Sequence, residues 1–109
     1  MVKKTSPSPE KSSKDLTDPV KEVAREFLVR NALGLHARAA ALLVKITSRY
    51  RSEITLRKDS LEVNGKSIME VLMLAAGRGS KILVRAKGED AQETMEELGR
   101  LFDNQFGEK

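Results

Sequence analysis

The sequence lacks cysteine and tryptophan and contains a single histidine, His36, among its 109 residues. The absence of cysteine excludes disulfide bonds, thiolate metal sites and cysteine nucleophiles, and it leaves carboxylates as almost the only metal ligands. With three Phe and one Tyr, the chain also has too few aromatic rings to stack against nucleic-acid bases. We therefore expect no metal site, no cofactor and no nucleic-acid partner.

Long apolar runs are missing as well. Stretches such as residues 39–44 are far shorter than the roughly 20 residues that a membrane-spanning helix needs. Lys3 and Lys4 stand near the start, but neither an apolar segment nor a small-residue cleavage site follows them, as both would in a secretory signal. We expect no membrane insertion and a cytoplasmic location.

The charge is distributed unevenly. Residues 27–87 contain twelve Lys or Arg against four Asp or Glu, whereas residues 88–109 contain two against seven. The middle of the chain is therefore strongly basic and its end is acidic. Such a pattern suits binding of an acidic protein or a phosphate group at least as well as binding of DNA.

The first residues differ in composition from the rest. Residues 1–18 are rich in Ser, Thr, Pro and charged residues, and they cannot bury enough apolar surface to offset the entropy lost on ordering. We predict a disordered N-terminal extension over residues 1–18. Asp18 and Pro19 form an N-cap and first-turn signal, which indicates a short helix or a linker over residues 19–25. The folded domain is then predicted to span residues 26–109.

Periodic patterns from residue 26 onward predict four strands and three helices. The predicted strands cover residues 27–29, 53–58, 61–63 and 81–87, and the predicted helices cover residues 37–50, 68–74 and 91–102. The order is βαββαβα. Because all three helices must cover one face of a four-stranded antiparallel sheet, the expected fold is an α/β (α+β) open-faced sandwich.

The segment NALGLHARAA, residues 31–40, has a specific chemical character. It places His36 after a glycine turn and at the predicted start of a helix, with Arg38 two residues later. Backbone N–H groups without helical partners and the helix dipole both favour anions at that end. Arg38 adds a guanidinium that can bind two phosphate oxygens at once. On this pattern alone, His36 is either a nucleophile in an anion site or a histidine that only caps the helix or faces solvent.

GLHARAA, residues 34–40, closely resembles the active-site motif GLHARPA of the HPr family of histidine phosphocarriers. The resemblance implies that His36 accepts a phosphoryl group on Nδ1 from enzyme I and donates it to an enzyme IIA component of a sugar phosphotransferase system. It also implies that Arg38 binds the phosphate. The chain would then be a stoichiometric carrier and not an enzyme, and we expect it to be a monomer.

A second segment, NGKSIMEVLMLAA at residues 64–76, resembles the family's regulatory region. Ser67 matches the serine that HPr kinase/phosphorylase modifies in organisms that have this enzyme. It also stands where a helix N-cap is expected, and one hydroxyl can serve both roles. The spacing of the apolar residues that follow is typical of a helix core, but the resemblance places them on a docking surface for partners. That surface comprises Ile68, Met69, Leu72 and Lys45.

The resemblance covers roughly residues 26–106 and includes three departures. Ala39 replaces the proline of GLHARPA, and Glu70 and Ala75 stand where many members have glycine. Two other functions remain open. One is a nitrogen-branch phosphocarrier, whose motif often has leucine before the glycine, as Leu33 is here. The other is an HPr-like regulatory binding protein in which phosphorylation serves only as a switch.

Overall fold

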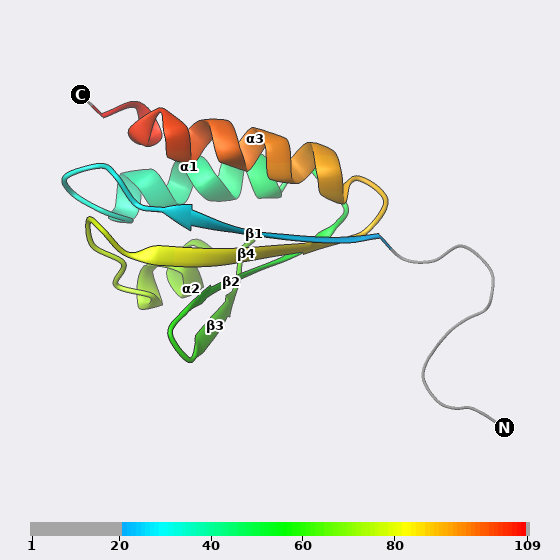
Figure 1. The fold of residues 1–109 in the computed structure, drawn as a ribbon, viewed down its shortest axis with the longest axis horizontal. Coiled ribbons are helices and arrows are strands. Elements are labelled where there is room, and N and C mark those ends of the chain that lie inside the picture. Colours follow the sequence, from blue (N-terminus) through cyan, green and yellow to red (C-terminus); the bar gives the residue numbers. More distant parts are fainter. Residues whose placement is uncertain (1–20, 109) are drawn as a thin grey trace, which may run out of the picture.

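Four antiparallel strands and three helices form the fold of the computed structural model, which describes residues 21–108 (Figure 1). The elements are β1 (Glu22–Leu28), α1 (Ala37–Thr47), β2 (Glu53–Lys58), β3 (Leu61–Asn64), α2 (Ile68–Met73), β4 (Lys81–Lys87), α3 (Ala91–Asp103) and the 3-10 turn η1 (Gln105–Gly107). Their order confirms the predicted βαββαβα arrangement. The predicted disordered extension, residues 1–18, lies outside the described residues.

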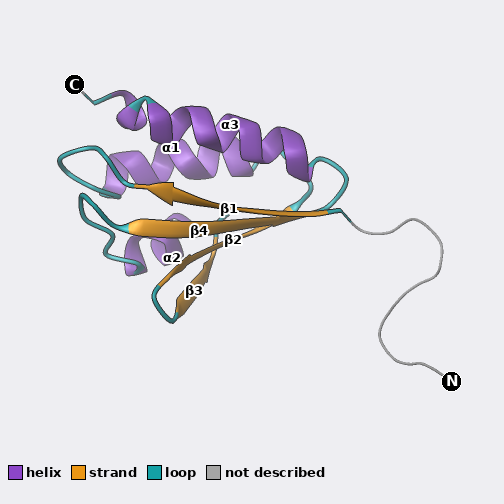
Figure 2. Cartoon of the chain, viewed as in Figure 1, coloured by secondary structure: helices purple, strands orange, loops and turns teal. Residues whose placement is uncertain are grey.

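The sheet has the strand order β1-β4-β2-β3, and every neighbouring pair is antiparallel. Alternation along β4 shows which face is covered, because Ile82, Val84 and Ala86 are buried while Leu83 and Arg85 are partly exposed. The helices cover the buried face and leave the other face open (Figure 2). This arrangement confirms the predicted open-faced sandwich.

Apolar side chains from the helices close the core against the sheet. Leu43 of α1 and Leu98 and Phe102 of α3 are almost completely buried, and each such side chain contributes about 1.5–3 kcal/mol relative to exposure. The ring of Phe102 stacks on Phe27 of β1 with a centroid distance of 4.7 Å. In the described part of the chain, no helix is both long and apolar enough to span a membrane.

The structure corrects the prediction of a short helix or linker at residues 19–25 over the part that it describes, while residues 19 and 20 lie outside the described residues. Residues 22–25 are the first part of β1, where Glu22 pairs with Lys87 and the strand continues to Leu28 opposite Lys81. The sheet therefore begins four residues before the predicted domain start. The local helix signal in the sequence was misleading here. It is weak, and the hydrogen bonds that these residues form with β4 stabilise a strand instead. The strand predicted at residues 27–29 is correspondingly longer.

Helix α1 ends at Thr47, three residues before its predicted end. Beyond Ser48, the N–H groups of Arg49 and Tyr50 donate to the carbonyls three residues back, those of Ile46 and Thr47, and so form a tight terminal turn. The carbonyl of Tyr50 accepts a 2.7 Å hydrogen bond from the Lys66 ammonium group. The hydroxyl of Tyr50 donates to the Glu97 carboxylate on α3 at 2.6 Å. These tertiary contacts hold the chain at the point where the helix ends.

Candidate functional site

The loop between β1 and α1 places His36 at the start of α1. Gly34 in this loop has a φ of +68°, and a Cβ there would lie 2.4 Å from the Ala76 carbonyl oxygen. The next residue, Leu35, donates its N–H to the same oxygen at 2.8 Å. The loop is thus held against the segment that follows α2, and only glycine fits at position 34. His36 is the N-cap of α1, so it stands at the start of a helix as predicted.

The imidazole of His36 makes a hydrogen bond through each ring nitrogen. The backbone N–H of Arg38 donates to Nδ1 at 3.3 Å, and Nε2 lies 2.5 Å from Oε2 of Glu108. Because a backbone N–H only donates and a carboxylate accepts, the partners assign the ring proton to Nε2 and a lone pair to Nδ1. The side chain is 29% exposed, so the ring remains accessible from outside.

Glu108 is a site residue that the sequence analysis missed. The hydrogen bond from His36 is the main cause that holds the pKa of the Glu108 carboxyl below its ordinary value, while its partial burial opposes this. Asn31, which donates from Nδ2 to Oε2 at 3.0 Å, and the backbone N–H of Leu33 lower the pKa further. The carboxylate is therefore ionised at neutral pH.

The turn η1 brings Glu108 back to the loop that carries His36. Gln105 and Phe106 have φ values of 59° and 56°, a left-handed conformation that costs about 1–2 kcal/mol for each residue other than glycine. Phe106 is buried and packs edge-on against Phe102, with ring centroids 5.0 Å apart. In Figure 1 the C-terminal end accordingly lies beside the loop that precedes α1. The sequence held no periodic signal for this return.

Ser67 is the N-cap of α2, which confirms its predicted structural role. Its Oγ accepts the N–H of Glu70 at 3.2 Å. In turn, Oε1 of Glu70 accepts the N–H of Asn64 at 2.9 Å. Glu70 therefore helps to hold the start of α2 and places a carboxylate at the segment that leads into this helix. Of the other predicted site residues, Arg38 and Lys45 are exposed on α1.

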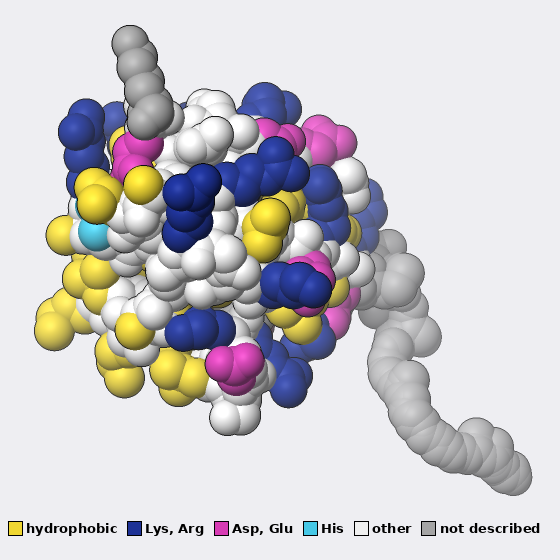
Figure 3. Space-filling view, turned by 60° about the vertical axis from the view of Figure 1, so that its left-hand side comes forward, with side chains coloured by type: hydrophobic (Ala, Val, Ile, Leu, Met, Phe, Trp, Pro, Cys, Tyr) yellow, Lys and Arg dark blue, Asp and Glu magenta, His cyan; other side chains and the backbone are white. Residues whose placement is uncertain are grey.

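The apolar residues predicted to dock partners lie on the surface and not in the core. Ile68, Met69 and Leu72 are 41%, 78% and 36% exposed. Leu33 and Met73, which the sequence analysis did not assign to this surface, are 69% and 62% exposed. Figure 3 shows hydrophobic side chains gathered beside the imidazole. We call these five exposed residues the apolar patch, and exposed apolar surface of this kind typically contacts other proteins.

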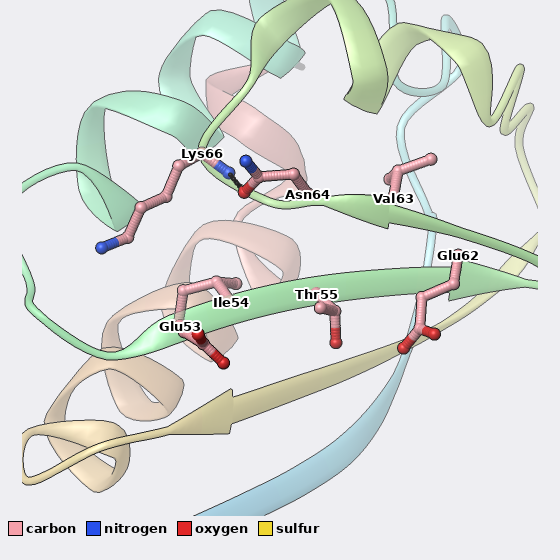
Figure 4. A pocket seen from close by; sticks show the side chains of 7 residues that line it. All are labelled: Glu53, Ile54, Thr55, Glu62, Val63, Asn64 and Lys66. Carbon is pink, nitrogen blue, oxygen red and sulfur yellow. Dashed lines mark hydrogen bonds between the residues drawn. The ribbon is translucent and has the colours of Figure 1, made fainter.

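A separate hollow of about 510 Å³ lies where β2 and β3 pair. The side chains of Glu53, Thr55 and Glu62 point to the same side of the sheet there (Figure 4). Neither the His36 loop nor α2 contributes to its lining, so the hollow is not part of the His36 site. Among residues 21–108, no three His, Asp or Glu side chains lie close enough together to hold a metal ion.

Comparisons with known proteins agree with this geometry. Residues 23–104 match the family model described as PTS HPr component phosphorylation site. The phosphocarrier protein HPr of Xylella fastidiosa is 51% identical over 83 residues, which cover 76% of this chain and 93% of that protein. HPr-C-His from Thermoanaerobacter tengcongensis superposes with a TM-score of 0.74 at 39% identity, over 82% of this chain and 98% of that one.

A crystal structure of an HPr dimer from the same organism matches with a TM-score of 0.64 at 35% identity, over 88% of this chain and all of that one. The family match covers most of the described residues and includes His36, and the relatives share both sequence and fold. The chain therefore belongs to the HPr family of phosphocarrier proteins of the phosphotransferase system.

Proposed function

We propose that His36 accepts a phosphoryl group on Nδ1 from enzyme I and donates it to an enzyme IIA component. The observation that carries this proposal is the hydrogen bonding of the ring, which leaves a lone pair on Nδ1 at the start of α1. A neutral nitrogen with a free electron pair is a nucleophile, and the N-terminal N–H groups of the helix favour the phosphate that it receives.

The transfer exchanges one bond to phosphorus for another. The Nδ1 electron pair forms the N–P bond while the bond from phosphorus to enzyme I breaks, and that bond's electron pair returns to enzyme I. Because Nδ1 carries no proton, no general base is needed on this chain. The protein acts as a carrier, and its partners supply most of the catalytic groups.

Arg38 supports the phosphorylated state in two ways. Its backbone N–H, which now donates to Nδ1, can donate to a phosphoryl oxygen once Nδ1 is bonded to phosphorus. Its exposed guanidinium can reach further phosphoryl oxygens through charge-assisted hydrogen bonds.

The apolar patch and Lys45 form the docking surface for enzyme I and enzyme IIA in this proposal. The patch is supported by its exposure and by its place beside His36 (Figure 3). Ser67, at the edge of the patch, is the regulatory site for HPr kinase/phosphorylase where that enzyme is present. The proposed carrier works in the cytoplasm as a monomer, and no nucleic acid takes part.

The proposal is tested by incubating the full chain with enzyme I and labelled phosphoenolpyruvate. We expect one acid-labile, base-stable phosphate, and His36→Ala should abolish it because His36 is the only imidazole. Ser67→Ala is the control and should be labelled normally.

Labelling of a folded His36→Ala variant would contradict the assignment. If wild type is not labelled by the enzyme I of either the carbohydrate or the nitrogen branch, the chain is a regulatory binding protein. Faster labelling by one of the two enzymes identifies the branch.

A further inference from the structure

We propose that Glu108 is a positioning residue for His36: it holds the ring proton on Nε2, keeps Nδ1 as the nucleophile and balances the charge of the phosphorylated ring. This inference rests on the proposed function of His36. The geometry behind it is the 2.5 Å contact between Nε2 and the Glu108 carboxylate, together with the contact of Nδ1 to the Arg38 N–H on the opposite side of the ring.

Asn31 holds the Glu108 carboxylate in place. Asn31 is completely buried, and its Nδ2 donates both to the Gly34 carbonyl at 2.7 Å and to Oε2 of Glu108 at 3.0 Å. Since both partners are acceptors, the orientation of the amide is determined. The same Oε2 atom contacts His36, so Asn31 fixes the carboxylate oxygen that contacts the ring.

The backbone conformation of η1 independently supports a role for Glu108 at His36. Gln105 and Phe106 adopt left-handed conformations although neither is glycine, and the burial of Phe106 against Phe102 holds them there. Strain of this kind persists only where the surrounding structure imposes it, and it is concentrated at functional sites. Here the strained turn reverses the chain after α3 and brings Glu108 onto His36.

Charge balance explains what the carboxylate contributes. The neutral ring carries its proton on Nε2, and formation of the N–P bond at Nδ1 places a positive charge on the ring while Nε2 keeps that proton. No proton leaves, so the hydrogen bond to Glu108 becomes one between a cationic ring and an anion, which is stronger. Glu108 therefore stabilises phosphorylated His36 more than the free form.

The contact itself can be measured by NMR on three variants of the full chain. Glu108→Gln keeps an acceptor but loses the charge, Glu108→Ala loses both, and Glu89→Gln is a matched control at an exposed acidic residue. In wild type and in the control we expect a downfield Nε2–H proton signal from His36. It should move upfield in Glu108→Gln and be lost to exchange with water in Glu108→Ala. The inference would be overturned if the Nε2–H signal were the same in all three variants, or if wild type showed no such signal.

A second experiment measures phosphoryl exchange between enzyme I and the same variants. We expect Glu108→Gln to shift the equilibrium away from the phosphorylated carrier by about fivefold, since a neutral acceptor replaces a charged one. The KM for enzyme I should not change, and Glu89→Gln should match wild type. If wild type and both Glu108 variants reach the same equilibrium, Glu108 has no such role and the proposed function stands. If enzyme I does not label wild type, both proposals fail.

Discussion

A few side chains determine what the His36 ring can do. The ring does not act alone, because the Arg38 N–H and the Glu108 carboxylate contact its two nitrogens and set which one is free. Arg38 differs from Glu108 in that its guanidinium is exposed at the surface, where it can meet an incoming phosphate. The two residues are therefore expected to affect different properties of the transfer.

Replacement of Arg38 by alanine should slow phosphoryl transfer without loss of the fold. The variant loses charge-assisted hydrogen bonds of about 1.5–3 kcal/mol, which corresponds to a roughly 10- to 150-fold lower rate. Arg38→Lys keeps the charge but not the paired donors, so its transfer rate should lie between those of wild type and Arg38→Ala. Rapid-quench measurements with enzyme I check this, and a transfer rate equal to wild type in Arg38→Ala would remove the residue from the mechanism.

At the scale of elements, α2 carries four of the five residues of the apolar patch, and Ser67 just before it caps the helix. The helix has six residues, and its start depends on the Ser67 hydroxyl and on the Glu70 carboxylate, which bonds to the backbone of Asn64. A negative charge is thus already present beside the patch. In relatives with glycine at the Glu70 position, that charge would be absent.

The variant Ser67→Asp should raise the KM for enzyme I with little change in melting temperature. Aspartate is as good an N-cap as serine, so α2 should be retained, while the new charge beside the patch must be desolvated when a partner docks. Glu70 imposes part of this penalty already, so the same change in a Glu70→Gly background should have a larger effect on KM.

Ser67→Ala is the control for that experiment. It removes the cap, which should cost about 1 kcal/mol of stability, and leaves KM unchanged. Equal KM values for wild type and Ser67→Asp would exclude the docking explanation. A large fall in the melting temperature of Ser67→Asp would show that the change acts through folding.

At the scale of the whole molecule, the sheet includes all of β1. The N–H of Gly88 donates to the Lys21 carbonyl at 2.8 Å, and Glu22 is the first residue paired with β4. Lys21 and Glu22 are therefore part of the fold. Residues 1–18 remain a predicted disordered extension.

A chain that starts at Pro19 should keep the melting temperature and the phosphorylation rate of the full protein, because it retains all of β1. A chain that starts at Arg25 should melt earlier, since it lacks the pairs that residues 22–24 make with β4. Differential scanning calorimetry and the enzyme I assay test both. A lower melting temperature for the chain that starts at Pro19 would show that residues 1–18 pack on the domain.

Local patterns in the sequence determined most of the fold. The strand at residues 81–87 and the start of α3 at residue 91 agree with the structure because their apolar residues alternate or recur with one clear period. The position of His36 at a helix start and the capping role of Ser67 were also predictable, since a helix start depends on residues within a few positions of it.

Only the tertiary structure decided the features that depend on residues far apart in the chain. Residues 22–25 became a strand because β4 lies beside them. Glu108 and Asn31 are 77 positions apart in sequence, and they meet at His36 because Phe106 packs into the core and η1 reverses the chain. Their meeting depends on the path of the folded backbone, and local periodicity carries no information about that path.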